Sequence, residues 1–332
     1  MGDRLLSIEE ARDLVAKTLE RCRTSPVNAA AVARALVAAE ADGLKGHGLV
    51  RVPSYAAQAK AGKVDGFATP VASRNAPGVL AVDAANGFAY PALDLATAAL
   101  PDIARAQGVA VAPIRRSHHC GAAGHPVEKL ARSGLVAMLF ANTPAAIAPW
   151  GGARGLFGTN PIAFACPIPD GFPIVVDLSL SNVPRGHILA ARQKGEAIPE
   201  GWAFDAAGRP ITDPDEALKG TMAPVGGAKG AALALMVELL AAGMTGANYA
   251  AEASSFFDDK GPPPGTGQLI IAFDPVAIGG PETLARFGLL AQMLEEQAGA
   301  RLPGERRRKN REAAERDGFR IDAALLAEIE AL

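Results

Sequence analysis

Histidine is rare in this chain, so its positions indicate where proton transfer could occur. Among 332 residues there are five histidines: His47, His118, His119, His125 and His187. Histidine is the side chain best suited to exchange a proton near neutral pH. The segments around these residues are therefore the first candidates for a site.

The segment 45–51 reads Lys-Gly-His-Gly-Leu-Val-Arg. The four-residue spacing predicts that His47 and Arg51 share one face of a helix. An arginine suits a carboxylate, and a nearby histidine can supply a proton. A histidine that caps a helix beside a surface arginine gives the same pattern, so these residues alone leave both readings open.

The segment 115–124 reads Arg-Arg-Ser-His-His-Cys-Gly-Ala-Ala-Gly and lies between a predicted strand and a predicted helix. Glycines and free backbone N–H groups at such a junction can receive a phosphate. Paired histidines suggest a metal, but no carboxylate or cysteine stands at a familiar ligand spacing, so no metal site is predicted. The alternative is a turn with two partly buried histidines.

A third segment, 141–167, is a glycine- and proline-rich stretch that is longer than a connector requires, and long ordered loops are often functional. The usual fingerprints are absent: the sequence has no G-x-G-x-x-G, P-loop, H-E-x-x-H or G-x-S-x-G motif. An ordinary Rossmann or P-loop nucleotide site is therefore disfavoured.

Both ends of the chain are predicted to be helical, and the middle alternates between strands and helices. Ser7 and Glu10 form a predicted capping box, and the helix that follows them is expected to reach Cys22. Two more helices are expected over 26–41 and over 52–61. The expected strands are 79–83, 108–114, 135–141, 162–166, 173–177 and 268–273, and the further helices are 91–106, 126–132, 227–240, 281–299, 305–317 and from 322. This alternation predicts an α/β core with helical segments at both ends.

Composition excludes several classes of protein. The formal net charge is −2, which argues against a nucleic-acid binder, and 49% hydrophobic against 20% charged residues argues against disorder. The three cysteines (Cys22, Cys120, Cys166) form no CxxC, so we expect a reducing cytoplasm rather than a disulfide scaffold. No apolar leader is visible, and the most apolar helix is too short to span a bilayer, so no membrane partner is expected.

Several motifs together resemble one known family. They are Gly-His-Gly-x-x-Arg at 46–51, Ser-His-His-Cys-Gly-Ala-Ala-Gly at 117–124, Leu-Phe-Gly-Thr-Asn-Pro-Ile-Ala at 156–163, Lys229-Gly230 and Arg-Leu-Pro-Gly-Glu-Arg-Arg at 301–307. Over nearly its whole length the chain resembles the malate/L-lactate/L-sulfolactate dehydrogenase type, which is distinct from the Rossmann lactate dehydrogenases. The segment 142–152 is most similar to the Δ1-piperideine-2-carboxylate/Δ1-pyrroline-2-carboxylate reductase branch, which reduces cyclic ketimine acids to L-pipecolate and L-proline with NAD(P)H.

The resemblance implies an α/β fold with a non-Rossmann, mixed-sheet NAD(P)-binding core and a helical domain from both chain termini, as in L-sulfolactate dehydrogenase. It also implies a homodimer. The implied division is a helical domain (1–65 and 281–332), an α/β dimerisation and substrate domain (66–114 and 222–280) and an NAD(P)-binding domain (115–221).

The resemblance also assigns roles to residues. His47 would be the proton donor in reduction, so we expect reduction to weaken as pH rises above about 7. The implied substrate contacts are Arg51, Thr159, Arg185 and Gly186. The implied cofactor contacts are His119, Cys120, Gly121, Ala122, Ala123, Asp177, Leu178, Ser179, Ala228, Lys229, Pro303, Gly304, Glu305, Arg306, Arg307, Arg308 and Lys309. The cations at 306–309 would favour NADPH, with NADH as the alternative.

Two positions depart from the reductase branch. That branch commonly has serine before the catalytic histidine and aspartate after an Arg-Gly pair, whereas this chain has Gly46 and His187. The usual relay cannot operate with these residues. His47 would then be oriented by water or backbone, or His187 would handle the proton, or the substrate would be a bulkier or acyclic imine, or activity on cyclic imines would be reduced.

The resemblance therefore implies an NAD(P)H-dependent oxidoreductase that acts on a small carboxylate. The leading hypothesis is reduction of a cyclic ketimine carboxylate to the L-amino acid, with hydride to the C=N carbon and a proton to nitrogen. The alternatives are a 2-hydroxy-acid dehydrogenase of the malate, lactate or ureidoglycolate type, with His119 as acid/base, and a catalytically silent cofactor-binding protein.

Overall fold

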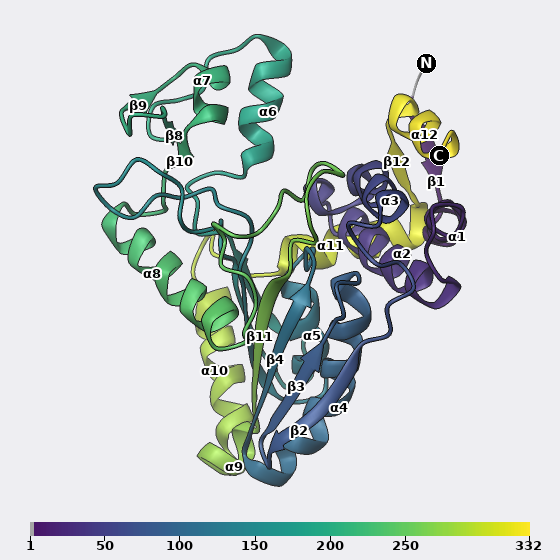
Figure 1. Cartoon of the computed structure of the whole chain (residues 1–332). Helices are drawn as coiled ribbons and strands as arrows, with labels where there is room; N and C mark the ends of the chain where they lie inside the picture. The colour runs from purple at the N-terminus through teal and green to yellow at the C-terminus, as the bar shows by residue number, and fades with distance from the viewer. Residues whose placement is uncertain (1–2) are drawn as a thin grey trace.

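The computed structural model describes residues 3–332, and a seven-stranded sheet forms its centre (Figure 1). The strand order is β2-β3-β4-β11-β5-β6-β7, and only β3 and β4 pair in parallel. A Rossmann sheet is mostly parallel, so the predicted mixed, non-Rossmann sheet is confirmed. The strands are β2 (Val71–Ala76), β3 (Val79–Asp83), β4 (Val109–Ser117), β5 (Val136–Ala141), β6 (Ile162–Cys166), β7 (Ile174–Leu178) and β11 (Thr266–Phe273).

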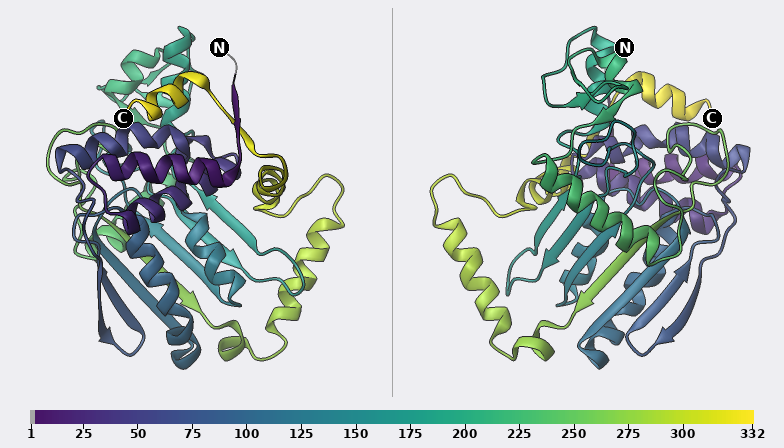
Figure 2. Two further views of the ribbon diagram at one scale, coloured as in Figure 1. Left: turned by 90° about the vertical axis from the view of Figure 1, so that its right-hand side faces the viewer. Right: turned by 60° about the vertical axis from the view of Figure 1, so that its left-hand side comes forward.

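Helices cover both faces of this sheet (Figure 2). On one face lie α4 (Ala89–Gln107) and α5 (Gly124–Arg132); on the other lies α8 (Ala228–Glu238), which continues into a π-helical turn, η3 (Leu239–Gly243). Burial follows this layering, because the central strand β11 is buried along most of its length, whereas β3 buries only alternate side chains.

The two ends of the chain meet in one group of helices. These are α1 (Ile8–Arg21), α2 (Pro26–Ala41), α3 (Val52–Ala61), α11 (Glu305–Asp317) and α12 (Ala323–Glu330). Strand β1 (Arg4–Leu6) pairs with β12 (Phe319–Ile321), α12 packs on α1, and α11 packs on α2. The capping box of Ser7 and Glu10 is present as predicted. The exact three-domain division stays a prediction.

A small lobe lies beyond the same end of the large sheet as the terminal helices (Figure 1). It contains a three-stranded sheet of β8 (Ala203–Phe204), β9 (Pro210–Ile211) and β10 (Thr221–Met222), with α6 (Arg185–Lys194) and α7 (Pro214–Lys219). The three strands were absent from our sequence-based prediction because two-residue strands leave no periodicity to detect, and helices α6 and α7 were missed as well.

Helices α9 (Pro275–Gly279) and α10 (Thr283–Glu295) follow the last strand of the large sheet, and α10 projects from the body (Figure 2). Helix α10 ends four residues earlier than the 281–299 expected from sequence. Among residues 3–332, no helix combines the length and the apolar character needed to cross a membrane.

Candidate active site

Strand direction gathers the predicted segments at one edge of the large sheet. Strands β3, β4, β5 and β7 run in the same direction, so their carboxyl ends lie at the same edge. The 117–124 segment follows β4, the 142–161 segment connects β5 to β6, and residues 179–187 follow β7. Sites in open α/β sheets commonly lie at the carboxyl ends of such strands.

The 45–51 segment is two short 3-10 turns, Lys45–His47 and Leu49–Arg51, rather than the single helix predicted from the spacing. Gly48 separates the turns, and a Cβ there would collide with the Glu40 carboxylate. Glu40 Oε2 accepts the Leu49 N–H at 3.0 Å. Burial raises the pKa of Glu40 above its usual value. The buried Glu40 therefore holds the segment that presents His47 and Arg51.

His47 stacks on His119, with ring centroids 5.2 Å apart and an interplanar angle of 18°. The Nδ1 atom of His47 is buried and has no hydrogen-bond partner among the described residues. Burial, followed by the nearby Arg51 charge, lowers the pKa of His47 to about 4. The ring is therefore neutral at pH 7 and can accept a proton. It loses its proton well below the pH of about 7 that we expected from the sequence.

Two tyrosines fix the state of His119. Tyr55 Oη lies 2.6 Å from His119 Nδ1, and 3.2 Å from Tyr90 Oη. Burial raises the pKa of Tyr55 to about 12 and that of Tyr90 well above its usual value, so both hydroxyls keep their protons. O–H donors bond at shorter distances than N–H donors, so we assign Tyr55 as the donor and Nδ1 as the acceptor. His119 then carries its proton on Nε2.

His118, the other member of the pair, is part of the core. Its Nε2 lies 3.0 Å from Gln58 Oε1, and its ring meets Phe88 and Phe256 edge-on. Burial lowers the pKa of His118 to about 3. This is the structural alternative considered for the histidine pair. Among residues 3–332, no three His, Cys, Asp or Glu side chains are placed to hold a metal ion.

Arg51 is held at one end and open at the other. Its Nε donates to the Gly46 carbonyl at 2.7 Å, and its guanidinium carbon lies 4.8 Å from the centroid of the Phe257 ring. The two terminal nitrogens make no hydrogen bond or ion pair within the described chain. A guanidinium oriented in this way can bind a carboxylate with two parallel hydrogen bonds.

Three of the predicted cofactor segments are in direct contact. Asp177 Oδ2 accepts the Gly124 N–H at 2.9 Å and an Arg307 Nη1 hydrogen at 3.2 Å. The Pro303 carbonyl accepts the Val175 N–H at 3.0 Å, and a Cβ on Gly304, which has φ +95°, would lie 3.2 Å from Val175 Cβ. The 119–124, 177–179 and 303–309 segments therefore form one surface around the end of β7.

The four cations at the start of α11 are not equivalent. Arg307 is bonded to Asp177, Arg308 to Glu312 at 2.7 Å, and Lys309 to Glu305 at 2.6 Å. Arg306 is exposed and makes no ion pair within residues 3–332. A helix amino terminus with an unpaired arginine attracts phosphate, so this surface fits the anionic half of a nicotinamide dinucleotide.

Other predicted cofactor and substrate residues also lie at this sheet edge, among them Thr159, Ser179 and Cys120. Thr159 N–H donates to Thr143 Oγ1 at 2.9 Å, and Ser179 Oγ donates to the Thr159 carbonyl at 3.3 Å. Burial raises the pKa of the Cys120 thiol to about 12, so it stays protonated. Ala228 and Lys229 begin α8, beside the Trp150 loop: a Cβ on Gly227 would lie 3.3 Å from the Trp150 ring.

The structure does not bring Arg185, Gly186 and His187 into contact with His47. They begin α6 in the small lobe, where Arg185 Nη2 donates to the Leu218 carbonyl at 3.2 Å. The exposed His187 ring has its centroid 5.9 Å from the centroid of the Trp202 ring. These three residues therefore stand apart from the histidine cluster.

Sequence reasoning missed Glu40, Tyr55, Tyr90 and Phe257. Tyr55 and Tyr90 are two of only three tyrosines in the chain, and that scarcity is the one signal that could have drawn attention to them. Glu40 and Phe257 lie in a helix and a loop that carry no motif, and only the fold brings them to the 46–51 segment.

Known proteins are similar to this chain over nearly its full length. A malate/L-lactate dehydrogenase family model matches residues 6–330. The chain is 50% identical over 304 residues to a (2R)-3-sulfolactate dehydrogenase (NADP(+)) from Chromohalobacter salexigens, covering 92% of this chain and 91% of that protein. It is 42% identical over 330 residues to a Δ(1)-pyrroline-2-carboxylate/Δ(1)-piperideine-2-carboxylate reductase from Pseudomonas aeruginosa, covering 98% of each.

Solved structures are also similar to this chain over nearly its whole length. The chain superposes on Δ1-piperideine-2-carboxylate reductase from Pseudomonas syringae pv. tomato with a TM-score of 0.93 at 38% identity, covering 99% of each chain. Sulfolactate dehydrogenase from Methanocaldococcus jannaschii gives a TM-score of 0.90 at 29% identity, covering 99% of this chain and 96% of that one. Fold, site and relatives together define an NAD(P)-dependent oxidoreductase, a dehydrogenase or reductase. The chain belongs to the malate/L-lactate dehydrogenase family.

Proposed function

We propose that this protein is an NADP-dependent dehydrogenase of a small dianionic 2-hydroxy acid, of the type named for its 50%-identical relative, (2R)-3-sulfolactate. The observation that carries the proposal is the 50% identity to that relative over 92% of this chain. The free terminal nitrogens of Arg51 suit the substrate carboxylate, and the neutral His47, unpaired at Nδ1, can accept the hydroxyl proton. This identity favours the 2-hydroxy-acid alternative over the ketimine hypothesis.

The two departures from the reductase pattern favour the same substrate. An aspartate in a histidine relay stabilises the imidazolium and would raise the histidine pKa. At the corresponding position this chain has His187, and Gly46 offers no hydroxyl to His47. Loss of the acidic side chain also removes a negative charge that would repel the second anionic group of a dianion.

In this proposal Arg51, His47 and His119 have separate roles in the reaction. Arg51 binds the substrate carboxylate with its two free terminal nitrogens and thereby holds the carbinol carbon. His47 accepts the hydroxyl proton on a ring nitrogen. His119, which carries its proton on Nε2, donates a hydrogen bond to the substrate oxygen without changing charge. We assign Thr159, Arg185 and Gly186 to the substrate side as well, on the family resemblance.

A bound nicotinamide cofactor supplies or accepts the hydride. In this proposal, His119 to Ala123, Asp177 to Ser179, Ala228, Lys229 and Pro303 to Lys309 hold it. Asp177 and Arg307 orient the 119–124 loop, because both are bonded to one another and Asp177 is bonded to Gly124. The unpaired Arg306 is the cation best placed to bind a 2′-phosphate, which supports NADPH over NADH.

A substrate panel tests the proposal. NADP⁺ reduction would be measured with (2R)-3-sulfolactate, malate and lactate, and NADPH oxidation with Δ1-piperideine-2-carboxylate, oxaloacetate and pyruvate. We expect kcat/KM for sulfolactate to exceed the others by about tenfold or more, a difference of about 1.4 kcal/mol. A kcat/KM that is highest for the cyclic imine would overturn it, and NADPH binding with no turnover of any substrate would indicate the silent cofactor-binding protein.

Ketimine reduction is the second candidate, and the Trp150 loop is the observation that favours it. Residues 142–152 match the reductase branch, and the loop lies beside the α8 terminus that carries Lys229. The relatives named as reductases include one that is 41% identical over 94% of this chain. The panel above decides between the two candidates.

We propose that the protein is a homodimer that covers the outer faces of α8 and α10. Large apolar side chains are exposed on both helices: Leu233, Leu235, Met236, Leu289, Leu290 and Met293. Soluble monomers rarely leave so much apolar surface open to water. Light scattering at micromolar concentration should give twice the monomer mass, and a Leu289→Glu/Leu290→Glu variant should shift that mass toward the monomer; an unchanged mass would place the interface elsewhere.

A further inference from the structure

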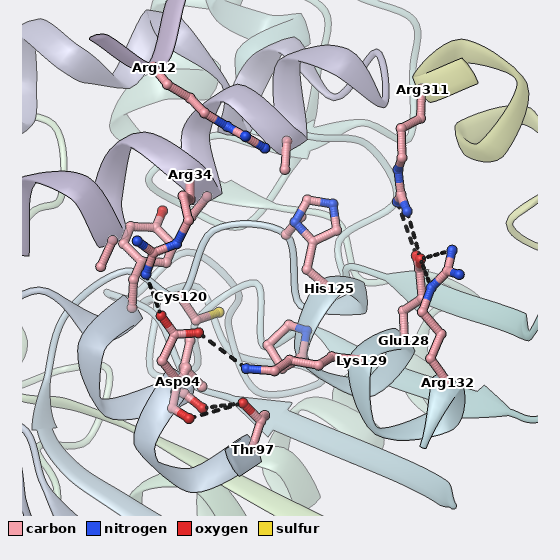
Figure 3. Close-up of a pocket in the computed structure, with 17 residues that line it drawn as sticks. Arg12, Arg34, Asp94, Thr97, Cys120, His125, Glu128, Lys129, Arg132 and Arg311 are labelled. Atoms are coloured by element: carbon pink, nitrogen blue, oxygen red, sulfur yellow. Dashed lines mark hydrogen bonds and ion pairs between the residues drawn. The ribbon is translucent and has the colours of Figure 1, made fainter. Parts of the chain in front are cut away.

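Away from the histidine cluster, a cavity open to solvent lies between the terminal helices and the α4–α5 layer, and its volume is about 430 Å³ (Figure 3). It is lined by α1, α2, α4, α5 and the 120–122 turn. His47, Arg51 and His119 do not line it. A cavity of this size matches the usual range for small organic ligands.

The wall of this cavity carries more positive than negative charge. Arg34 Nη2 lies 3.0 Å from Asp94 Oδ2, and Lys129 Nζ lies 3.5 Å from Asp94 Oδ1. Arg12 extends into the same space (Figure 3) and forms no ion pair in the described part of the chain. Three cations thus face a single carboxylate, and the surplus of two positive charges matches a dianion.

The other charged residues in the wall already have partners. Glu128 accepts from Arg132 and Arg311, at 2.9 and 2.6 Å. His125 Nε2 lies 2.9 Å from Asp42 Oδ2. These groups stabilise the junction of α2, α5 and α11, so the Arg12, Arg34 and Lys129 group is the part of the wall open to a ligand.

The floor is apolar. Ala31, Ala35 and Ala38 form a row of small side chains on α2, and Leu93 and Pro126 lie around them. Arginines beside such a floor stack well on flat rings. The combination suits an organic anion with a ring at one end and a doubly charged group at the other.

We propose that this cavity is an effector site for a flat-ringed organic dianion, a function beyond the proposed oxidoreductase activity. Tyr90 lines the cavity, its hydroxyl is bonded to Tyr55, and Tyr55 is bonded to His119. The Tyr90 hydroxyl also lies against Gly121, where an added Cβ would come within 2.7 Å of it. A ligand that orders Tyr90 therefore orders both the catalytic histidine and the cofactor loop.

Phenyl phosphate is a suitable probe because it has the ring and the dianion but no 2-hydroxy acid. Calorimetry would use enzyme saturated with NADPH, with phenol and orthophosphate as separate arms. We expect one site per chain, with phenyl phosphate binding about tenfold tighter than either fragment. Competition with NADPH, an orthophosphate affinity equal to that of phenyl phosphate, or no binding at millimolar concentration would overturn the proposal.

Variants separate this site from surface charge in general. The Arg12→Gln/Arg34→Gln double variant should weaken phenyl phosphate about tenfold or more and leave NADPH turnover unchanged. Arg74→Gln, on the edge strand β2, is the matched control and should bind normally. If the double variant does not fold, Lys129→Gln provides the same test. Undiminished binding in these variants would contradict the assignment.

If the two sites are coupled, each ligand must change the affinity of the other by the same factor. Saturating phenyl phosphate should lower the NADPH dissociation constant by about threefold, and NADPH should tighten phenyl phosphate by the same factor. Tyr90→Phe should abolish the mutual effect while phenyl phosphate still binds. No mutual effect in the unmodified protein would refute an effector role.

Discussion

Tyr55→Phe is the sharpest test of the site, because it removes one oxygen from a fully buried ring. The change deletes the 2.6 Å bond to His119 Nδ1 and leaves the Tyr90 hydroxyl without its acceptor. The phenylalanine ring keeps the contacts with Phe88, so no cavity larger than the missing oxygen forms.

The cost follows from two buried polar groups that lose a partner. Each such group costs about 1–3 kcal/mol, and partial relaxation keeps the total unfolding cost near the lower end, about 2 kcal/mol. The tautomer of His119 is no longer fixed, so its Nε2 proton is lost from part of the population. A catalytic penalty of about 1–2 kcal/mol corresponds to about a 5- to 30-fold fall in kcat.

Three measurements check this result: urea unfolding, steady-state kinetics and ¹⁵N chemical shifts of the histidine rings. Tyr90→Phe is the matched control, since it removes a buried hydroxyl but keeps the direct Tyr55–His119 bond. It should lose less stability, about 1 kcal/mol, because only one hydrogen bond is removed, and its kcat should fall much less. If Tyr55→Phe leaves both kcat and the His119 nitrogen shifts unchanged, the assigned role of Tyr55 is wrong.

Three further predictions concern the rest of the site. Gly46→Ser should keep the free energy of unfolding within about 0.5 kcal/mol of the original, because a Cβ there meets nothing within 4 Å. It should also raise kcat/KM for ketimine reduction relative to kcat/KM for the hydroxy acid. An unchanged ratio of these two values would count against a relay. Arg306→Gln should raise KM for NADPH about tenfold and leave KM for NADH unchanged, and equal effects on both would exclude a 2′-phosphate contact. The three histidines at 47, 118 and 119 all have pKa values lowered by burial, so the folded state binds fewer protons than the unfolded chain. Lowering the pH from 7.5 to 5.5 should therefore decrease the free energy of unfolding by about 1 kcal/mol or more, because the unfolded histidines bind protons while the buried rings stay neutral; urea unfolding curves that give the same free energy at both pH values would contradict this.

The sequence determined the local elements because their signals are local. The capping box at Ser7, the helix over 305–317 and the strand over 162–166 need only nearby residues, and each is present as predicted. Fixed motifs at 46–51 and 117–124 likewise identified the segments that carry His47 and His119, because motif spacing survives without knowledge of the fold.

Only the tertiary structure decided how these residues work. Gly48, with φ −94° and ψ −142°, interrupts the expected helical face. The Glu40 carboxylate occupies the space of a Cβ there, a contact between separate elements that spacing cannot reveal. The division of His118 and His119 into a core residue and a polarised donor depends on Gln58 and Tyr55, two residues of α3. Burial sets the pKa of His47, and burial is a property of the assembled molecule. The sequence thus specified which side chains could do chemistry, and packing determined their protonation states and partners.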